Sequence, residues 1–174
     1  MWEKGRGATM IRTAEVFDAA DYQNLIERLE AESDYLLFGK GERKSTVEQV
    51  EGLIQKVKKE ENSSIFLSEL NGKVNGHVTV FGGGAPRVLH TASVITGVLK
   101  DFHGQGVARE LFFHLFEWAE EKGVTRLELT VMVHNERAVH FYERMGFEKE
   151  GVKRQSLIIN RRPVDEYLMA KILV

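Results

Sequence analysis

The hydrophobic positions of the chain follow two different spacings, one typical of strands and one typical of helices. In some segments apolar and β-branched residues alternate or run together, and in others apolar residues recur every three or four positions. The second spacing predicts helices that begin near Asp18 or Asp21, at Ser45 or Thr46, at Val107 and after Asn135. The first predicts seven strands, over residues 11–17, 64–70, 74–81, 88–99, 127–133, 147–159 and 164–174.

The order of these elements is β-α-α-β-β-β-α-β-α-β-β, which predicts an α/β (α+β) fold with a mixed, twisted sheet and helices on both faces. Asn71-Gly72 predicts a tight hairpin between two of the strands, and residues 160–163 predict the turn between the last two. The glycine-rich segment 82–87 has no helix after it, so we interpret it as a flexible connection and not as a phosphate loop.

A short turn, His103-Gly104-Gln105-Gly106, joins a β-branched run to the helix that begins at Val107. Its two glycines remove side chains where the first turn of the helix leaves backbone N–H groups unpaired. A phosphate could approach these groups closely and meet the positive end of the helix dipole. The turn therefore predicts an anion site, although a tight connection without a ligand has the same appearance when the turn is taken alone.

Composition narrows the classes of function that the chain can serve. The 174 residues are enough for one domain, which we expect over residues 10–174 with a disordered extension over residues 1–9. A net charge of −2 argues against a general nucleic-acid binder, and the absence of cysteine excludes disulfides and thiolate chemistry. No run is long and apolar enough to cross a membrane, so we expect a cytoplasmic protein with no membrane partner.

A second motif makes the glycine turn specific. Residues 135–147 read N-x-x-A-x-x-F-Y-x-x-x-G-F, with Ala138, Phe141 and Tyr142 near Asn135 on one side of a helix and Gly146 as its C-cap. This motif resembles a signature of the GNAT N-acetyltransferase superfamily. The superfamily's other signature, Q/R-x-x-G-x-G/A, falls on residues 103–108, where His103 replaces the usual Gln or Arg. The resemblance implies a central sheet of about seven strands flanked by about four helices.

The resemblance also implies acetyl-CoA as co-substrate and a transfer of its acetyl group to a primary amine. The glycine turn would bind the pyrophosphate, the strand end before it the pantetheine arm, and Asn135 would also contact the arm. Tyr142 would protonate the departing thiolate as a general acid, whereas a tyrosine that only packs is the structural alternative. The implied cofactor-binding residues are Val98, Leu99, Gly104, Gln105, Gly106, Val107, Ala108, Asn135, Ala138, Phe141 and Tyr142.

The general base is open at this point. Some members that acetylate protein N-termini resemble one another in having a glutamate where this chain has Thr130, and Glu128 lies on the same face of the same strand. Glu128 is therefore a candidate base, and an ion pair is its structural alternative. His90 and His134 are further candidate bases, because histidine commonly serves as a general base near neutral pH, and ordinary polar residues at strand ends are their structural alternative. A water chain without a dedicated base is a further alternative, and the transfer needs no metal.

The acceptor is a small-molecule amine or a protein amine. The resemblance assigns its pocket to residues 31–44 and 160–163, the latter with Arg161 and Arg162. A non-catalytic acyl-CoA-binding or sensor domain is the alternative function, and it would not need Tyr142. A nucleotide-binding α/β enzyme lacks support, because no early strand and helix carry G-x-G-x-x-G. The final strands of such sheets can pair between protomers, so a homodimer is also compatible with the chain.

Overall fold

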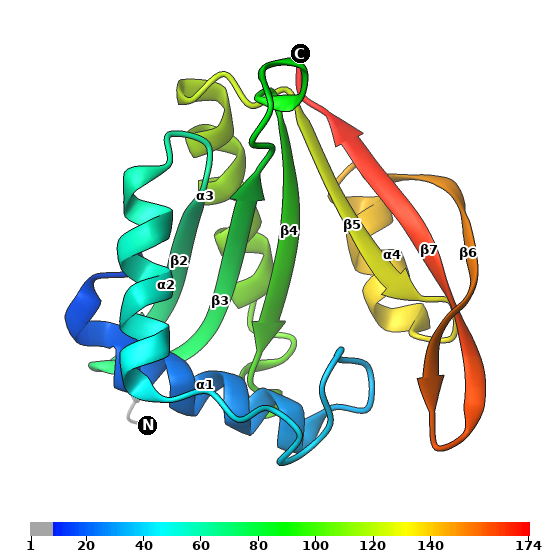
Figure 1. Ribbon diagram of the computed structural model, residues 1–174, viewed down its shortest axis with the longest axis horizontal. Helices are drawn as coiled ribbons and strands as arrows, with labels where there is room; N and C mark the ends of the chain where they lie inside the picture. The colour runs from blue at the N-terminus through cyan, green and yellow to red at the C-terminus, as the bar shows by residue number, and fades with distance from the viewer. Residues whose placement is uncertain (1–8) are drawn as a thin grey trace, which may run out of the picture.

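A seven-stranded sheet separates two pairs of helices in the computed structural model, which describes residues 9–174 (Figure 1). The extension expected over residues 1–9 lies, apart from Thr9, outside the described residues. The helices are α1 (Ala19–Glu32), α2 (Val47–Lys59), α3 (Val107–Glu121) and α4 (Glu136–Arg144). The strands are β1 (Met10–Thr13), β2 (Ser64–Leu70), β3 (Lys73–Gly82), β4 (Thr91–Val98), β5 (Arg126–Met132), β6 (Glu148–Ile159) and β7 (Arg162–Ile172).

The strands lie in the order β1-β2-β3-β4-β5-β7-β6. All neighbours are antiparallel except β4 and β5, which are parallel. Parallel strands need a crossover, and α3 supplies it. The predicted fold class, a mixed sheet of seven strands with four helices, is confirmed.

The first strand is shorter than predicted, because a polar network turns the chain after Thr13. The Asp18 carboxylate accepts a hydrogen bond from the Glu15 amide at 2.7 Å and two from the Arg12 guanidinium at 2.7 Å each. These contacts hold residues 16–18 in a 3₁₀ turn that leads into α1. The Arg12 guanidinium also holds the pKa of Asp18 below its usual range.

Two other predicted boundaries are corrected. The strand predicted from residue 88 begins at Thr91, because Pro86 starts a short 3₁₀ turn that ends at Val88. The turn predicted over residues 160–163 is only Asn160-Arg161, with φ of 51° and 63°, so β7 begins at Arg162. The hairpin predicted at Asn71-Gly72 is confirmed, and both residues have the positive φ that this turn requires.

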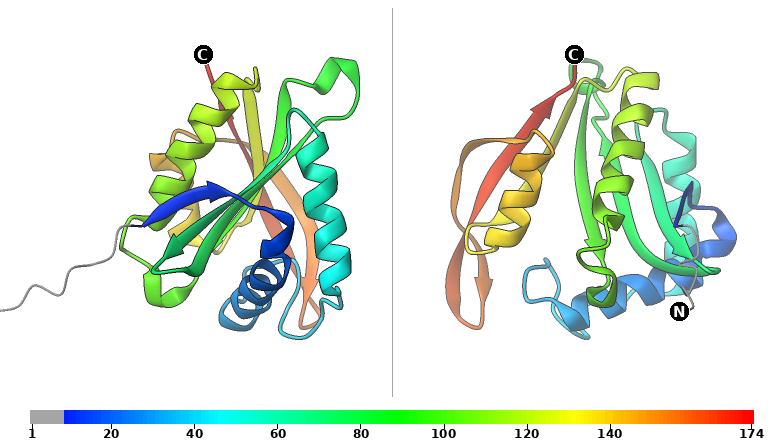
Figure 2. Two further views of the ribbon diagram at one scale, coloured as in Figure 1. Left: turned by 90° about the vertical axis from the view of Figure 1, so that its left-hand side faces the viewer. Right: turned by 180° about the vertical axis from the view of Figure 1, so that it is seen from behind.

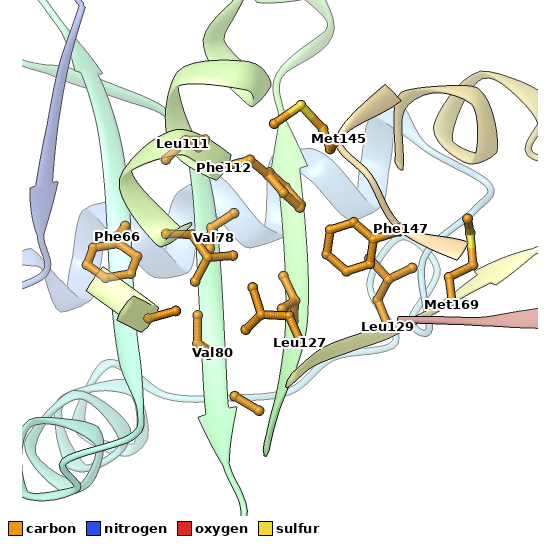
Figure 3. Close-up of a cluster of buried hydrophobic side chains, with 14 of the residues drawn as sticks. Phe66, Val78, Val80, Leu111, Phe112, Leu127, Leu129, Met145, Phe147 and Met169 are labelled. Atoms are coloured by element: carbon orange, nitrogen blue, oxygen red, sulfur yellow. The ribbon is translucent and has the colours of Figure 1, made fainter. Parts of the chain in front are cut away.

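Helices α1 and α2 cover one face of the sheet and α3 and α4 the other (Figure 2), and a hydrophobic core lies under each pair. One fills the space under α1 and α2 and contains Leu25 and Ile54. The other lies under α3 and α4 and is centred on the fully buried Phe112, which Figure 3 shows above the strand residues Val78 and Leu127. None of the described helices is long and apolar enough to cross a membrane.

A buried histidine makes the free energy of unfolding depend on pH. His77 on β3 is 2% exposed, its Nδ1 lies 3.0 Å from Thr79 Oγ1, and Tyr22 Oη lies 2.8 Å from the same oxygen. Burial, with a smaller effect of the Arg43 charge, lowers the pKa of His77 from 6.5 to about 4. As the pH falls, the unfolded chain therefore takes up a proton at His77 before the folded chain does. The contribution of the neutral, buried His77 to the free energy of unfolding is complete above pH 6.5 and is lost as the pH falls towards about 4.

We expect His77 to account for about 2 to 3 kcal/mol of lost stability between pH 7 and about pH 4.5. Urea unfolding of the wild type and of His77→Gln at both pH values measures it. The variant carries no titrating group at this position, so its loss should be smaller by that amount. Equal losses in the two proteins would contradict the assignment.

Candidate active site

The sheet opens between its two parallel strands. β4 and β5 are paired only from Thr91–Arg126 to Ser93–Glu128, although both strands continue well beyond these pairs. Figure 1 shows them close together at the top of the view and diverging towards the bottom. Because none of the described strands fills the gap, the lower half of β4 has a neighbour on one side only.

The free side of β4 can be identified from its pairing with β3. Leu99 N–H donates to the Asn75 carbonyl at 2.9 Å, and Gly83 N–H donates to that of Thr91 at 2.9 Å. Odd-numbered residues of β4 therefore direct their backbone groups towards β3, and even-numbered residues direct theirs towards the gap. Val94, Thr96 and Val98 thus direct their backbone groups into the gap, where an extended ligand can pair with the unbonded ones as an added strand.

Helix α3 begins at the same end of the gap without a side-chain cap. Thr46 caps α2 and Asn135 caps α4, but α3 starts at Gly106, which has no side chain and a φ of 84°. Gly104, with a φ of 74°, completes the turn. The first bond within α3 is from Glu110 N–H to the Gly106 carbonyl at 3.0 Å. The backbone N–H groups of residues 104–109 therefore have no backbone partner and could bind an anion.

One large groove connects the open edge of β4, the start of α3 and one side of α4. Its volume is about 1940 Å³. This is well above the roughly 300–1,000 Å³ of a common small-ligand pocket and suits a long ligand together with a second substrate. The predicted cofactor-binding residues that line it are Val98, Gly104, Gln105, Gly106, Val107, Ala108, Asn135, Ala138, Phe141 and Tyr142.

Leu99 is the one predicted cofactor-binding residue outside the groove. Its amide is bonded to Asn75, and its side chain is buried in the core under α1 and α2. Val98, by contrast, faces the gap, but its carbonyl oxygen already lies 2.7 Å from Nε2 of His103. The even-numbered residues earlier in β4 are therefore better placed than Leu99 to pair with a ligand.

Tyr142 lies on α4 with its ring in an aromatic cluster. Its centroid is 5.9 Å from that of Phe112, 5.6 Å from that of Phe141 and 6.0 Å from that of Phe147. No hydrogen bond within the described part of the chain uses its hydroxyl group, and burial raises its pKa to about 12. The phenol therefore keeps its proton at neutral pH and is held in the groove with that proton available for donation.

The groove continues towards the other face of the sheet, where other elements line it. Of the segment 31–44, predicted to shape the acceptor pocket, residues 33–37 line the groove, with the Tyr35 ring 5.3 Å from that of His134. The predicted Arg161 and Arg162 do not line it. The β6–β7 hairpin contributes instead through its strands, with Glu166 and Ser156 among the lining residues. Glu166 is 12% exposed and accepts a hydrogen bond from Ser156 Oγ at 2.7 Å.

Glu128 shares a face of β5 with Thr130, as expected, but only Thr130 lines the groove. Glu128 is at the last paired position of β4 and β5, and its carboxylate is 3.2 Å from Nε of Arg126. Glu166 lies opposite Met132, further towards the open end. The structure thus brings Glu166, and not Glu128, into the groove that contains Tyr142.

Sequence reasoning missed Glu166 and Arg137. No local sequence pattern identifies Glu166 as a site residue, because its place in the groove depends on the pairing of β7 with β5. Arg137 had one local signal: a cation in the first turn of a helix opposes the helix dipole, although Glu136 stands beside it in the same turn, as Glu110 stands beside Arg109 in α3.

Comparison with known proteins gives consistent matches. The model of the acetyltransferase (GNAT) family matches residues 29–147. A protein of Escherichia coli K12 named L-amino acid N-acetyltransferase is 35% identical over 104 residues, which are 59% of this chain and 64% of that protein. A ribosomal-protein-alanine N-acetyltransferase of the same organism is 37% identical over 54 residues, 31% of this chain and 36% of that protein. The chain spans less than two thirds of the length of these curated relatives.

Solved structures match almost the whole chain. A GNAT-family acetyltransferase from Streptococcus pneumoniae superposes with a TM-score of 0.91 at 30% identity and covers 96% of this chain and 100% of its own. A Salmonella typhimurium structure, described as an acetyltransferase with its cofactor acetyl-CoA, superposes with a TM-score of 0.85 at 18% identity over 97% of this chain and 95% of its own. The second likeness shows a shared fold.

Proposed function

The chain belongs to the GNAT acetyltransferase family, and we propose that it transfers an acetyl group from acetyl-CoA directly to a primary amine. The observation that carries the proposal is the opening in the sheet. There the free edge of β4, the uncapped start of α3 and the hydroxyl of Tyr142 line one groove. A ligand with an arm of amides, an anionic end and a reactive end matches these three features in that order.

Each part of the groove has a separate task in this proposal. The amides at the start of α3 bind the pyrophosphate, and Val94 and Thr96 pair with amides of the pantetheine arm. Asn135 also faces the groove, and its Oδ1 is occupied as the cap of α4, 3.4 Å from the Ala138 amide. Its side-chain N–H groups therefore remain for the arm.

The chemistry supplied by acetyl-CoA is a thioester that an amine can attack. The amine must first lose a proton, its nitrogen then forms a bond to the carbonyl carbon, and the carbon–sulfur bond breaks with the electron pair on sulfur. Tyr142 donates its proton to that sulfur. A second group must accept the proton of the amine.

We propose Glu166 as the carboxylate that binds the amine and accepts its proton. Thr130, where some relatives carry a glutamate, pairs with Leu168 on β7, and Glu166 is the next residue of β7 on the same face. A carboxylate from the neighbouring strand can therefore reach the space above Thr130. Lys153 Nζ lies 3.8 Å from Glu166 and would attract an acceptor that also carries a carboxylate.

Replacing the two glutamates separately tests this assignment against Glu128. We expect Glu166→Gln to lower kcat/KM for the amine roughly tenfold to hundredfold, the range of one charge-assisted hydrogen bond. Glu128→Gln removes the same charge from the Arg126 ion pair and should change kcat/KM less than about threefold. The opposite order in steady-state assays would favour Glu128 as the base.

The names of the two Escherichia coli relatives both specify an amino-acid amine as the acceptor. For this chain we propose the same class, a primary amine of a free amino acid or of a peptide. Parallel screening of L-amino acids and short peptides for release of free CoA would distinguish the two.

The experiment that tests the proposed function is a calorimetric titration with acetyl-CoA, CoA and, as a control, ATP. Binding of both CoA species but not of ATP, followed by amine-dependent CoA release, supports an N-acetyltransferase. CoA binding without turnover on any amine would favour a sensor domain. Absence of CoA binding would overturn the proposal.

A further inference from the structure

His103 connects two elements that meet at the glycine turn. Its Nε2 is 2.7 Å from the Val98 carbonyl oxygen, and its Nδ1 is 3.0 Å from Nη1 of Arg137. A carbonyl oxygen only accepts hydrogen bonds and a guanidinium only donates them. His103 therefore carries its proton on Nε2 and accepts with Nδ1, which makes it a neutral bridge from the end of β4 to the first turn of α4.

This bridge fixes the position of a charge. Arg137 lines the groove beside Gly104 and Gly106, and none of the ion pairs among residues 9–174 includes it. One guanidinium N–H is used on His103, and the others remain for a ligand. Because the positive end of the α4 dipole disfavours a cation, this arrangement gains stability when an anion arrives.

The other cations at this end of the groove already have acidic neighbours. Arg109 lies 3.5 Å from the Glu110 carboxylate, and the Glu32 carboxylate accepts from the backbone amide of Lys100 at 2.8 Å. The turn itself supplies no cation, since the Gln105 side chain donates to the Asp101 carbonyl at 2.8 Å. Arg137 is thus the cation at this end whose guanidinium is oriented by a neutral side chain and not by a carboxylate.

We propose that Arg137, positioned by His103, is the cationic contact to the pyrophosphate of CoA. The inference rests on the proposed function and assigns the side-chain charge that the glycine turn lacks. It also gives His103 a role that an arginine at this position could not have, because an arginine could not accept a hydrogen bond from Arg137, whereas a neutral imidazole can. In this chain the cation stands on the facing helix, and the imidazole orients it.

Calorimetry with CoA and dephospho-CoA tests the contact, because dephospho-CoA keeps the pyrophosphate and lacks the 3′-phosphate. We expect Arg137→Gln to raise Kd for both ligands by a similar factor, roughly ten- to thirtyfold. The KM for acetyl-CoA should rise along with the Kd, since the effect is on binding. Arg154→Gln removes the same charge from β6 outside the groove and should leave both Kd values within about twofold.

A double-mutant cycle tests the positioning role of His103. His103→Ala should raise the Kd for CoA about threefold to tenfold in the wild-type background and less than about twofold when Arg137 is already Gln. A residue that only supports the turn would give the same factor in both backgrounds, which would overturn the positioning role.

The remaining outcomes separate this inference from the proposed function. If the wild type binds CoA and Arg137→Gln binds both ligands equally well, the contact is wrong while the proposed function stands. If only CoA and not dephospho-CoA loses affinity, Arg137 contacts the 3′-phosphate and the pyrophosphate assignment is overturned. If the wild type binds neither ligand, the proposed function itself fails.

Discussion

Tyr142→Phe is expected to lower kcat about a hundredfold or more and to change the Kd for acetyl-CoA less than about threefold. The variant keeps the ring that packs on Phe112 and Phe141 and removes only the hydroxyl group, which no described residue binds. The fold and the groove should therefore persist. Without the phenol, the sulfur must leave as an unprotonated thiolate in a partly buried site, which raises the barrier.

The matched control for this variant is Tyr167→Phe. Tyr167 packs against the same core from β7 but does not line the groove. The variant Tyr167→Phe should therefore retain the wild-type kcat. Stopped-flow or single-turnover measurements would show whether the loss in Tyr142→Phe lies in the chemical step. A Kd that rises in parallel with the loss of activity, with an unchanged chemical step, would mean that the hydroxyl only binds the ligand.

Gly106→Glu is expected to raise the Kd for CoA about a hundredfold or more. Three effects combine here: a side chain in the left-handed region costs roughly 1–2 kcal/mol, the new side chain covers the free amides of α3, and its charge repels phosphate. The space around a Cβ at Gly106 is open in the structure, so the protein can still fold. Calorimetry and thermal unfolding together measure both consequences.

Gly123 offers a closely matched control for this change. It also has a left-handed φ, 69°, and open space where a Cβ would stand, but it lies beyond the other end of α3 and outside the groove. Gly123→Glu introduces the same strain and the same charge. It should show a similar loss of thermal stability and an unchanged Kd for CoA. Equal Kd values for the two variants would contradict the anion site at Gly106.

The helix starts could be predicted because neighbouring residues determine them. Thr46 forms a reciprocal capping pair with Gln49, and the Asn135 side chain accepts from the Ala138 amide. The end of β1 could not be predicted in this way. It depends on Arg12, which also donates to Glu69 at 3.0 Å from a strand far along the chain. Such a contact is visible only once β1 and β2 are paired.

The residues of the candidate site also differ in whether a local sequence pattern could locate them. The glycine turn, Asn135 and Tyr142 are close in sequence to the elements they serve, so a local pattern could locate them. Whether Val98 or Leu99 faces the gap depends on which of them bonds to β3, and this is a property of the pairing register. Glu166 reaches the groove only because β7 lies beside β5. A linear pattern contains neither piece of information.

The short parallel contact between β4 and β5 has a mechanical consequence. It joins a half-sheet of four strands to one of three, and beyond Ser93 the described parts of β4 and β5 are no longer paired across the join. A pantetheine arm paired with β4 would fill the gap between the two half-sheets and would stiffen the join while acetyl-CoA is bound. Loss of the acetyl group would leave these backbone hydrogen bonds intact. Departure of CoA, and not entry of the amine, would therefore require the two half-sheets to separate slightly.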